Sequence, residues 1–213
     1  MADLNGAGTT RRTNSRASLL TAARVLFAER GFNGTSTKEL AAAAQVTEPT
    51  LFRHFPTKVI LFEAAVITPL QEFIAELAVT LTSRELTNAS PYDHAYHFCS
   101  GLYEVLEENR ALIVALIATR TFNEAAAERF PEVQSTLTNL LDLLEDVTRA
   151  EAMKRGWDVD AAIVVRLIFG LVFSAAIHTD WLFPEGEPPD RETIVSEMAR
   201  FTLQGLSQTS PTQ

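Results

Sequence analysis

The sequence predicts an all-α protein, in which a three-helix N-terminal head precedes a larger helical body, with about nine helices in total. Two observations lead to this class. Apolar residues recur at helical spacing through most of the 213-residue chain, and helix start and stop signals divide it at short intervals. No segment shows a convincing strand pattern. The apolar fraction of 46% and the charged fraction of 21% are ordinary for a globular protein and exclude general disorder.

The first helix is predicted from about Ser15 to Arg30, after a polar, basic arm at residues 1–13 that we expect to be flexible. Gly31 is the predicted stop, because glycine readily adopts the left-handed backbone that ends many helices.

Residues 32–58 are typical of a helix-turn-helix, a pair of short helices of which the second can lie in the major groove of DNA. A capping box starts the first motif helix, because Ser36 and Glu39 each bind the other's backbone N–H. The predicted apolar stripe that follows consists of Leu40, Ala43 and Ala44.

Residues 45–47 form the predicted turn. Thr47 caps the second motif helix, and Pro49 lies in its first turn, where a missing N–H does no harm. Leu51 and Phe55 are predicted to face inward. The outward face is short and partly basic, and it consists of Thr47, Glu48, Thr50, Phe52, Arg53 and His54.

In order and spacing these residues, with Gly31-Phe32 before them and residues 55–58 after them, resemble the DNA-binding signature of TetR-type transcriptional regulators. The resemblance covers roughly residues 14–61. It implies an all-helical homodimer, a ligand-binding C-terminal body and, in most members, repression. We therefore expect a DNA-binding domain at 14–57 and an effector-binding and dimerisation domain at 58–213.

Position in the motif implies two kinds of DNA contact. Ser36, Thr37 and Lys58 would bind backbone phosphates. The groove would receive Thr47, Glu48, Pro49, Thr50, Phe52, Arg53 and His54. Arg53 would contact either a phosphate or a guanine. The arginines at the start of the chain would reach flanking DNA or remain solvated; they are Arg11, Arg12 and Arg16.

The chain departs from the family pattern at four positions. Glu48, Pro49 and Phe52 stand where lysine, glycine and tyrosine are common, and Gln45 replaces the usual turn glycine, so we expect it in left-handed backbone. Phe52 lacks the hydroxyl that a tyrosine would offer to a phosphate. Glu48 either accepts a hydrogen bond from a cytosine amino group or only complements the positive end of its helix.

The predicted body helices cover about residues 56–83, 92–108, 110–120, 131–155 and 191–206. A further helix, which either Asp158 or Asp160 caps, is predicted to run to about residue 182. The segment from Ile163 to Leu182 is apolar all round and must be covered on both sides. Either it is central to its own domain, or one face packs on a twofold mate. The second interpretation makes the last two helices the homodimer interface, as the resemblance implies.

A cavity for a small effector is supported only by the resemblance. The candidate ligand-binding residues are His97, Tyr103, Phe122, Arg166, Phe169, Phe173 and His178. Arg166 is the strongest candidate, for an anionic ligand, although it can equally pair with Asp142, Glu145 or Asp146. Aromatic residues at helical spacing are also typical of plain core. His94 and His97 are three residues apart near Cys99, but no fourth metal ligand is evident, so we expect no metal site.

Charge divides the chain. Residues 1–58 carry eight Lys/Arg against four Asp/Glu, a net +4, and residues 59–213 carry ten against twenty-three, a net −13. Only the head suits phosphates. The chain has no secretory signal, no apolar run of about 20 residues for a membrane span, and a single cysteine, so we expect a cytoplasmic protein.

No motif of a nucleotide-binding or hydrolytic enzyme is present, and we expect neither catalysis nor a cofactor. The leading hypothesis is a ligand-responsive regulator, a repressor released from a palindromic DNA operator by a small apolar ligand of unknown identity. The alternative is an activator, or a regulator controlled by a protein partner.

Overall fold

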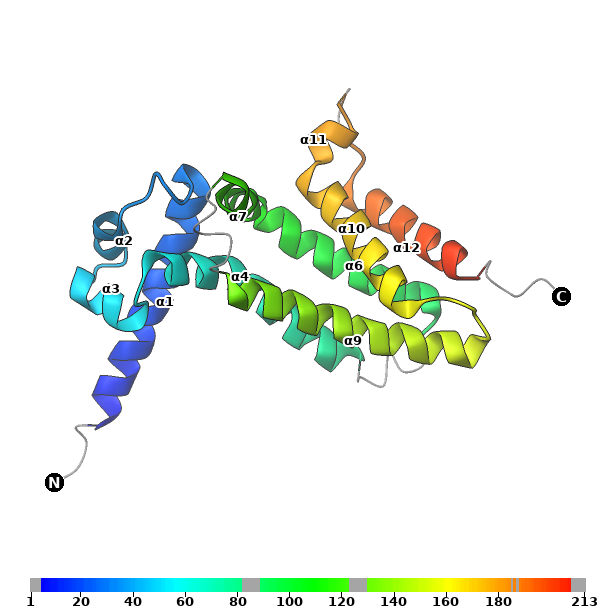
Figure 1. Cartoon of the computed structure of the whole chain (residues 1–213), viewed down its shortest axis with the longest axis horizontal. Helices are drawn as coiled ribbons and strands as arrows, with labels where there is room; N and C mark the ends of the chain where they lie inside the picture. Colours follow the sequence, from blue (N-terminus) through cyan, green and yellow to red (C-terminus); the bar gives the residue numbers. More distant parts are fainter. Residues whose placement is uncertain (1–4, 82–88, 123–129, 185, 187, 208–213) are drawn as a thin grey trace. The chain divides into compact units, whose positions relative to one another are not determined.

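The computed structural model describes residues 5–81, 89–122, 130–184, 186 and 188–207, and within these residues it contains ten helices and no strand (Figure 1). The helices are α1 (Asn5–Arg30), α2 (Thr37–Ala43), α3 (Glu48–His54), α4 (Lys58–Leu81), α6 (Pro91–Glu108), α7 (Arg110–Phe122), α9 (Pro131–Arg155), α10 (Ala161–Ile177), α11 (Thr179–Leu182) and α12 (Arg191–Ser207). The all-α prediction is therefore confirmed.

The chain divides into two compact units. The first combines Met1–Pro69 with Ala111–Gln134, and the second combines Leu70–Arg110 with Ser135–Gln213. The unit that holds the helix-turn-helix is thus larger than the predicted domain at 14–57. Two helices, α4 and α9, each run from one unit into the other.

Aromatic packing explains why the start of α4 belongs to the first unit. Phe62 on α4 is fully buried, and its ring lies 4.8 Å from that of Phe27 and 5.2 Å from that of Phe32, measured between centroids. Phe130, just before α9, contacts the same ring at 6.0 Å. Rings at these distances and tilts attract each other beyond simple burial, so α4 is anchored to α1.

Helix α1 begins at Asn5, ten residues before the predicted start, so its backbone includes most of the segment that we expected to be an arm. Its end is confirmed, because Gly31 has a φ of +67° and ends the helix in left-handed backbone. Gly156 has a φ of +66° and ends α9 in the same way, as predicted.

The segment predicted as one helix to Leu182 is interrupted. Asp160 caps α10 and accepts a hydrogen bond from the backbone N–H of Ile163. Of the two predicted caps, Asp158 and Asp160, the second is therefore confirmed. α10 then ends at Ile177, and the short α11 begins at Thr179. The predicted loop at 83–91 falls mostly outside the described residues.

In the second unit α6 packs against both α10 and α12 (Figure 1). Gly101 on α6 allows a close approach to α4, because a Cβ atom there would lie 2.6 Å from the ring of Phe73. The buried residues of this core include Leu102, Tyr103 and Val172. None of the described helices is long and apolar enough to cross a membrane.

Candidate DNA-binding surface and effector cavity

The helix-turn-helix is built by the local signals that the sequence carries. Ser36 and Glu39 form the complete capping box of α2, with hydrogen bonds of 2.9 and 3.2 Å to each other's backbone N–H. Gln45 has a φ of +55°, which confirms the left-handed turn position. Thr47 caps α3, and Pro49 lies in its first turn.

The apolar sides of α2 and α3 form the core of the motif, with one correction. Leu40, Leu51 and Phe55 are buried as predicted, and so is Ala44. Ala43 is exposed, whereas the buried residues of the stripe are Leu40, Ala41 and Ala44. The prediction of Ala43 was therefore wrong, because Ala41 takes its place on the buried side of α2.

The outer face of α3 presents an apolar ring, a cation and hydroxyl groups to the exterior. Phe52 is 43% exposed and Arg53 is exposed, while His54 is half-buried. The hydroxyls of Thr47 and Thr50 lie 3.1 Å apart at the start of the helix. Within this first compact unit the face has the composition expected of a recognition helix.

Glu48 has a role that neither sequence interpretation contained. The hydroxyl of Thr37 donates to Oε1 of Glu48 across 2.7 Å, and this bond joins the first turn of α2 to the first turn of α3. The carboxylate also lies at the positive end of α3. Glu48 therefore helps to fix the angle between the two motif helices.

All three residues predicted to bind phosphate are engaged within the protein, Thr37 through its hydrogen bond to Glu48. The hydroxyl of Ser36 donates to Oε2 of Glu39 at 2.6 Å. The ammonium of Lys58 lies 4.3 Å above the ring of Phe32, and burial lowers the pKa of that lysine. Arg16, by comparison, is exposed and lies 5.2 Å from the ring of Phe55. This cation–π contact was not predicted, and it holds a positive charge beside the end of α3.

Comparison with known protein families finds a match for the helix-turn-helix and the residues next to it. The family model described as "Bacterial regulatory proteins, tetR family" matches residues 19–65, which contain α2, α3 and the start of α4. Residues 19–65 therefore form a DNA-binding domain of the TetR family, and the protein is a DNA-binding transcriptional regulator.

Relatives extend the likeness over nearly the whole chain. The uncharacterised HTH-type transcriptional regulator YvkB of Bacillus subtilis is 29% identical over 92% of this chain and 98% of its own length. The HTH-type transcriptional repressor KstR2 of Rhodococcus jostii is 25% identical over 93% and 94%. The fold is shared with the regulator FadR of Bacillus subtilis, solved with stearoyl-CoA, at a TM-score of 0.68, 17% identity and coverage of 91% and 98%.

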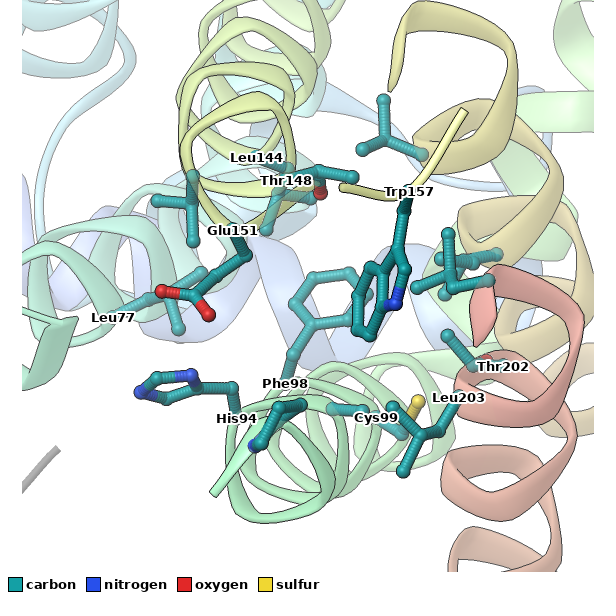
Figure 2. A pocket seen from close by; sticks show the side chains of 16 residues that line it. Leu77, His94, Phe98, Cys99, Leu144, Thr148, Glu151, Trp157, Thr202 and Leu203 are labelled. Atoms are coloured by element: carbon teal, nitrogen blue, oxygen red, sulfur yellow. The ribbon is translucent and has the colours of Figure 1, made fainter. Parts of the chain in front are cut away.

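The second unit contains a cavity of about 100 Å³ (Figure 2). Its walls come from α4, α6, α9, α10 and α12 and from the segment after α9. The lining is mainly apolar, with Leu77, Phe98, Leu144, Trp157 and Val165 among its residues. A concave, mainly apolar site with few polar groups is the usual form of a small-molecule site.

The polar members of the lining are few and chemically distinct. Glu151 accepts hydrogen bonds from Lys154 at 2.6 Å and from Arg155 at 3.2 Å, and the bond from Lys154 is the largest of the effects that lower its pKa. Cys99 is fully buried, and burial raises the pKa of its thiol to about 12. Cys99 is therefore an unreactive thiol in the folded state.

None of the six predicted ligand-binding residues whose side chains the structure describes lines the cavity. His97 is exposed, Tyr103 is buried in the core, and the side chain of Phe122 lies outside the described residues. Phe169 stacks on Phe173 at 5.9 Å between ring centroids. No sequence pattern distinguished the residues of α9 and α12 that do line it.

Two further candidates make other contacts. Arg166 is half-exposed, with Nη1 3.5 Å from Oε2 of Glu145, which is one of the ion pairs that the sequence left open. The ring of His178 lies 5.2 Å from that of Trp181, which is 81% exposed on α11. Neither residue belongs to the lining of the cavity.

The outer side of α10 and α12 carries exposed apolar residues. Ile163 and Leu167 on α10 are 57% and 67% exposed, and Phe201 on α12 is 71% exposed. They line a shallow groove of about 430 Å³ together with Gly205. Exposed apolar surface of this kind on adjacent helices marks an interaction site.

Proposed function

We propose that the protein is a homodimeric repressor that leaves a palindromic operator when a small apolar ligand enters the cavity of the second unit. The observation that carries the proposal is the course of α4. This helix starts at Lys58, directly after the recognition helix, and contributes Leu77 to the cavity wall. A ligand that moves α4 therefore acts on the element that holds the head.

A second connection supports the same route. Oε1 of Glu63 on α4 accepts the backbone N–H groups of Glu132 and Val133 at 2.7 and 3.1 Å. These donors belong to the first turn of α9, which has no intrahelical acceptor for them. The other end of α9 lines the cavity with Leu144 and Thr148. Two of the helices that line the cavity, α4 and α9, are thus bonded to each other inside the first unit.

We infer that the mechanism is a shift between two states. A twofold dimer presents its recognition helices to half-sites about 34–36 Å apart, or a multiple of that, so only one spacing of the heads docks both. A ligand that binds more tightly to a dimer with another spacing of the heads lowers the affinity for the operator. It can lower that affinity by no more than the ratio of its own affinities for the two states. Ligand and operator must then weaken each other by the same factor.

We assign the dimer interface to the outer faces of α10 and α12. The exposed residues Ile163, Leu167 and Phe201 would be covered there, and Gly170 and Gly205 allow close approach of the partner's helices. A second copy also explains why α10 is apolar on a side that its own unit leaves uncovered.

DNA contact is assigned to the predicted residues with two adjustments. Arg53 and Phe52 are the exposed centre of the face, and Arg16 joins them as a cation beside α3. Thr37 and Glu48 act by positioning α2 against α3, so their effect on DNA is indirect. We infer a regulator in the cytoplasm, without catalytic activity, in keeping with the regulator names of its relatives.

The alternative is an activator, or a regulator that answers to a protein partner. It predicts operator binding that no small molecule weakens. The relatives include named repressors and also a named activator, FasR of Mycolicibacterium smegmatis. The cavity with a wall on α4 favours control by a small molecule over control by a protein partner.

The deciding experiment selects random duplex DNA on the purified dimer at near-physiological salt. We expect an inverted repeat, and we expect Arg53→Ala to lose it while Arg149→Ala, an exposed arginine on α9, retains it. The recovered operator then serves to screen small apolar molecules for release. Binding without any recovered motif would contradict sequence-specific regulation.

A further inference from the structure

The hydroxyl of Thr202 in the cavity wall has no hydrogen-bond partner among the described residues. Thr202 on α12 lies between the cavity and the outer groove, lines both, and is only 8% exposed. Its hydroxyl oxygen is itself buried. Folded proteins satisfy nearly all such groups, so this hydroxyl marks the place where a polar group of a ligand would bind.

The carboxylate of Glu151 lies across the cavity from Thr202. Figure 2 shows Glu151 and His94 on one side of the cavity and Trp157 and Thr202 on the other. Because Glu151 is held by Lys154 and Arg155, it stays ionised and its negative charge is already paired.

These groups select against charged ligands. The lining contains no lysine or arginine among the described residues. Its histidine, His94, lies on the same side of the cavity as the carboxylate of Glu151, so an anion would lose its hydration and find no cation away from that carboxylate. It would also meet the carboxylate of Glu151. A cation would have to compete with the two side chains that Glu151 already binds. An uncharged molecule avoids both penalties.

The size of the cavity limits the buried part of the ligand. An engineered cavity of about 150 Å³ in another protein, lined by similar apolar side chains, holds one benzene molecule. The present cavity, at about 100 Å³, therefore encloses about four non-hydrogen atoms, and the rest of a longer ligand would extend through its open side.

We propose that the effector buries a compact, uncharged apolar group carrying one hydroxyl or carbonyl that hydrogen-bonds to Thr202. The inference rests on the proposed role of the cavity as the effector site. It assigns Thr202 as the residue that selects for a polar group and Glu151 as the residue that excludes acids.

The chain provides its own reporter. Of its two tryptophans, Trp157 lines the cavity and Trp181 is exposed. In the Trp181→Phe protein the fluorescence of Trp157 alone is followed while 1-hexanol, hexanoate or hexylamine is added. We expect a saturable change with 1-hexanol and affinities at least about 10-fold lower for the two charged analogues, because neither finds a counter-charge.

Two variants then test Thr202 in the same background. Thr202→Val keeps the shape and removes the hydroxyl, so the affinity for 1-hexanol should fall about fivefold. Thr202→Ser keeps the hydroxyl and should stay within about twofold. The melting temperature of Thr202→Val should not fall, because the variant removes an unsatisfied buried group, and this result separates lost binding from lost folding.

Each other outcome overturns part of the proposal. Hexanoate that binds as well as 1-hexanol removes the exclusion of acids, and hexylamine that binds best makes Glu151 a counter-ion instead. Equal affinities of Thr202→Val and its parent remove the role of Thr202. If no probe alters Trp157 while the protein still binds its operator and another metabolite releases it, the ligand class is wrong and the regulatory function stands. Failure to bind any specific operator would instead contradict the proposed function.

Discussion

Removal of the Glu63 carboxylate should destabilise the protein more than removal of any exposed carboxylate on the same helix. Glu63 is 3% exposed, and its oxygen is the acceptor for two backbone N–H groups at the start of α9. Glu63→Ala leaves these donors buried without an acceptor. Glu63→Gln keeps an oxygen at that position and removes the charge.

The magnitude follows from the two bonds. Hydrogen bonds to a charged group contribute about 1.5–3 kcal/mol each, and the cost of burying the carboxylate offsets part of that sum. We expect Glu63→Ala to lower the free energy of unfolding by about 2–4 kcal/mol. Glu63→Gln should stay within about 1 kcal/mol of the parent, because both bonds persist with a neutral acceptor.

The pH dependence gives a second test. Burial is the largest effect on Glu63 and raises its pKa above the ordinary value of 4.5, against the two backbone hydrogen bonds, which lower it. A raised pKa in the folded state favours the protonated form, so the folded protein binds more protons than the unfolded chain. The stability gained from protonation is complete below pH 4.5 and is lost as pH rises through the folded-state pKa. Glu63→Gln lacks this loss, so its stability relative to the parent should increase with pH in that range.

Urea unfolding followed by circular dichroism, at one protein concentration, measures both effects. Glu76→Ala is the matched control, because Glu76 is an exposed carboxylate on α4. The reasoning is refuted if Glu63→Ala costs no more than the control, or if the alanine and glutamine variants are equally unstable.

Three further predictions concern the interface, the thiol and the motif. Leu167→Glu should convert the dimer to monomers in sedimentation, whereas Met153→Glu, equally exposed but on α9, should leave it intact; the reverse result would place the interface elsewhere. Cys99 should resist iodoacetamide at pH 8 until urea unfolds the protein, because its thiol pKa is about 12, and fast labelling of the folded dimer would contradict that environment. Thr37→Val and Glu48→Ala should each reduce operator affinity about two- to tenfold, and the double variant should do no worse than either, since both break one hydrogen bond. Additive losses measured by fluorescence anisotropy would mean that each residue contacts DNA by itself.

The features that the sequence predicted well are those decided by neighbours along the chain. The capping box at Ser36, the left-handed Gln45 and the stop at Gly31 each depend on only a few consecutive residues, and all three are confirmed. The start of α9 at Pro131 also depends on a local signal and was predicted correctly. The start of α1 was misjudged, because polar residues such as those at 5–14 are compatible with helix and with coil alike.

The cavity could not be predicted, because it depends on which sides of five helices meet. α10 is apolar on every side, so periodicity could not separate its core side, with Val165 and Val172, from its outer side, with Ile163 and Leu167. Arg166 was therefore assigned to a ligand, although it lies on the exposed side and pairs with Glu145.

The same geometry changes the expected chemistry of the effector. An arginine in the cavity would have favoured an anion, whereas Glu151 and the unpartnered hydroxyl of Thr202 favour a neutral molecule. The net charge of −13 on residues 59–213 acts in the same direction at long range, because it lowers the local concentration of anions around the body. Charge thus separates the two ligands of this protein: the basic head attracts DNA phosphates, and the acidic body leaves a neutral effector free to enter.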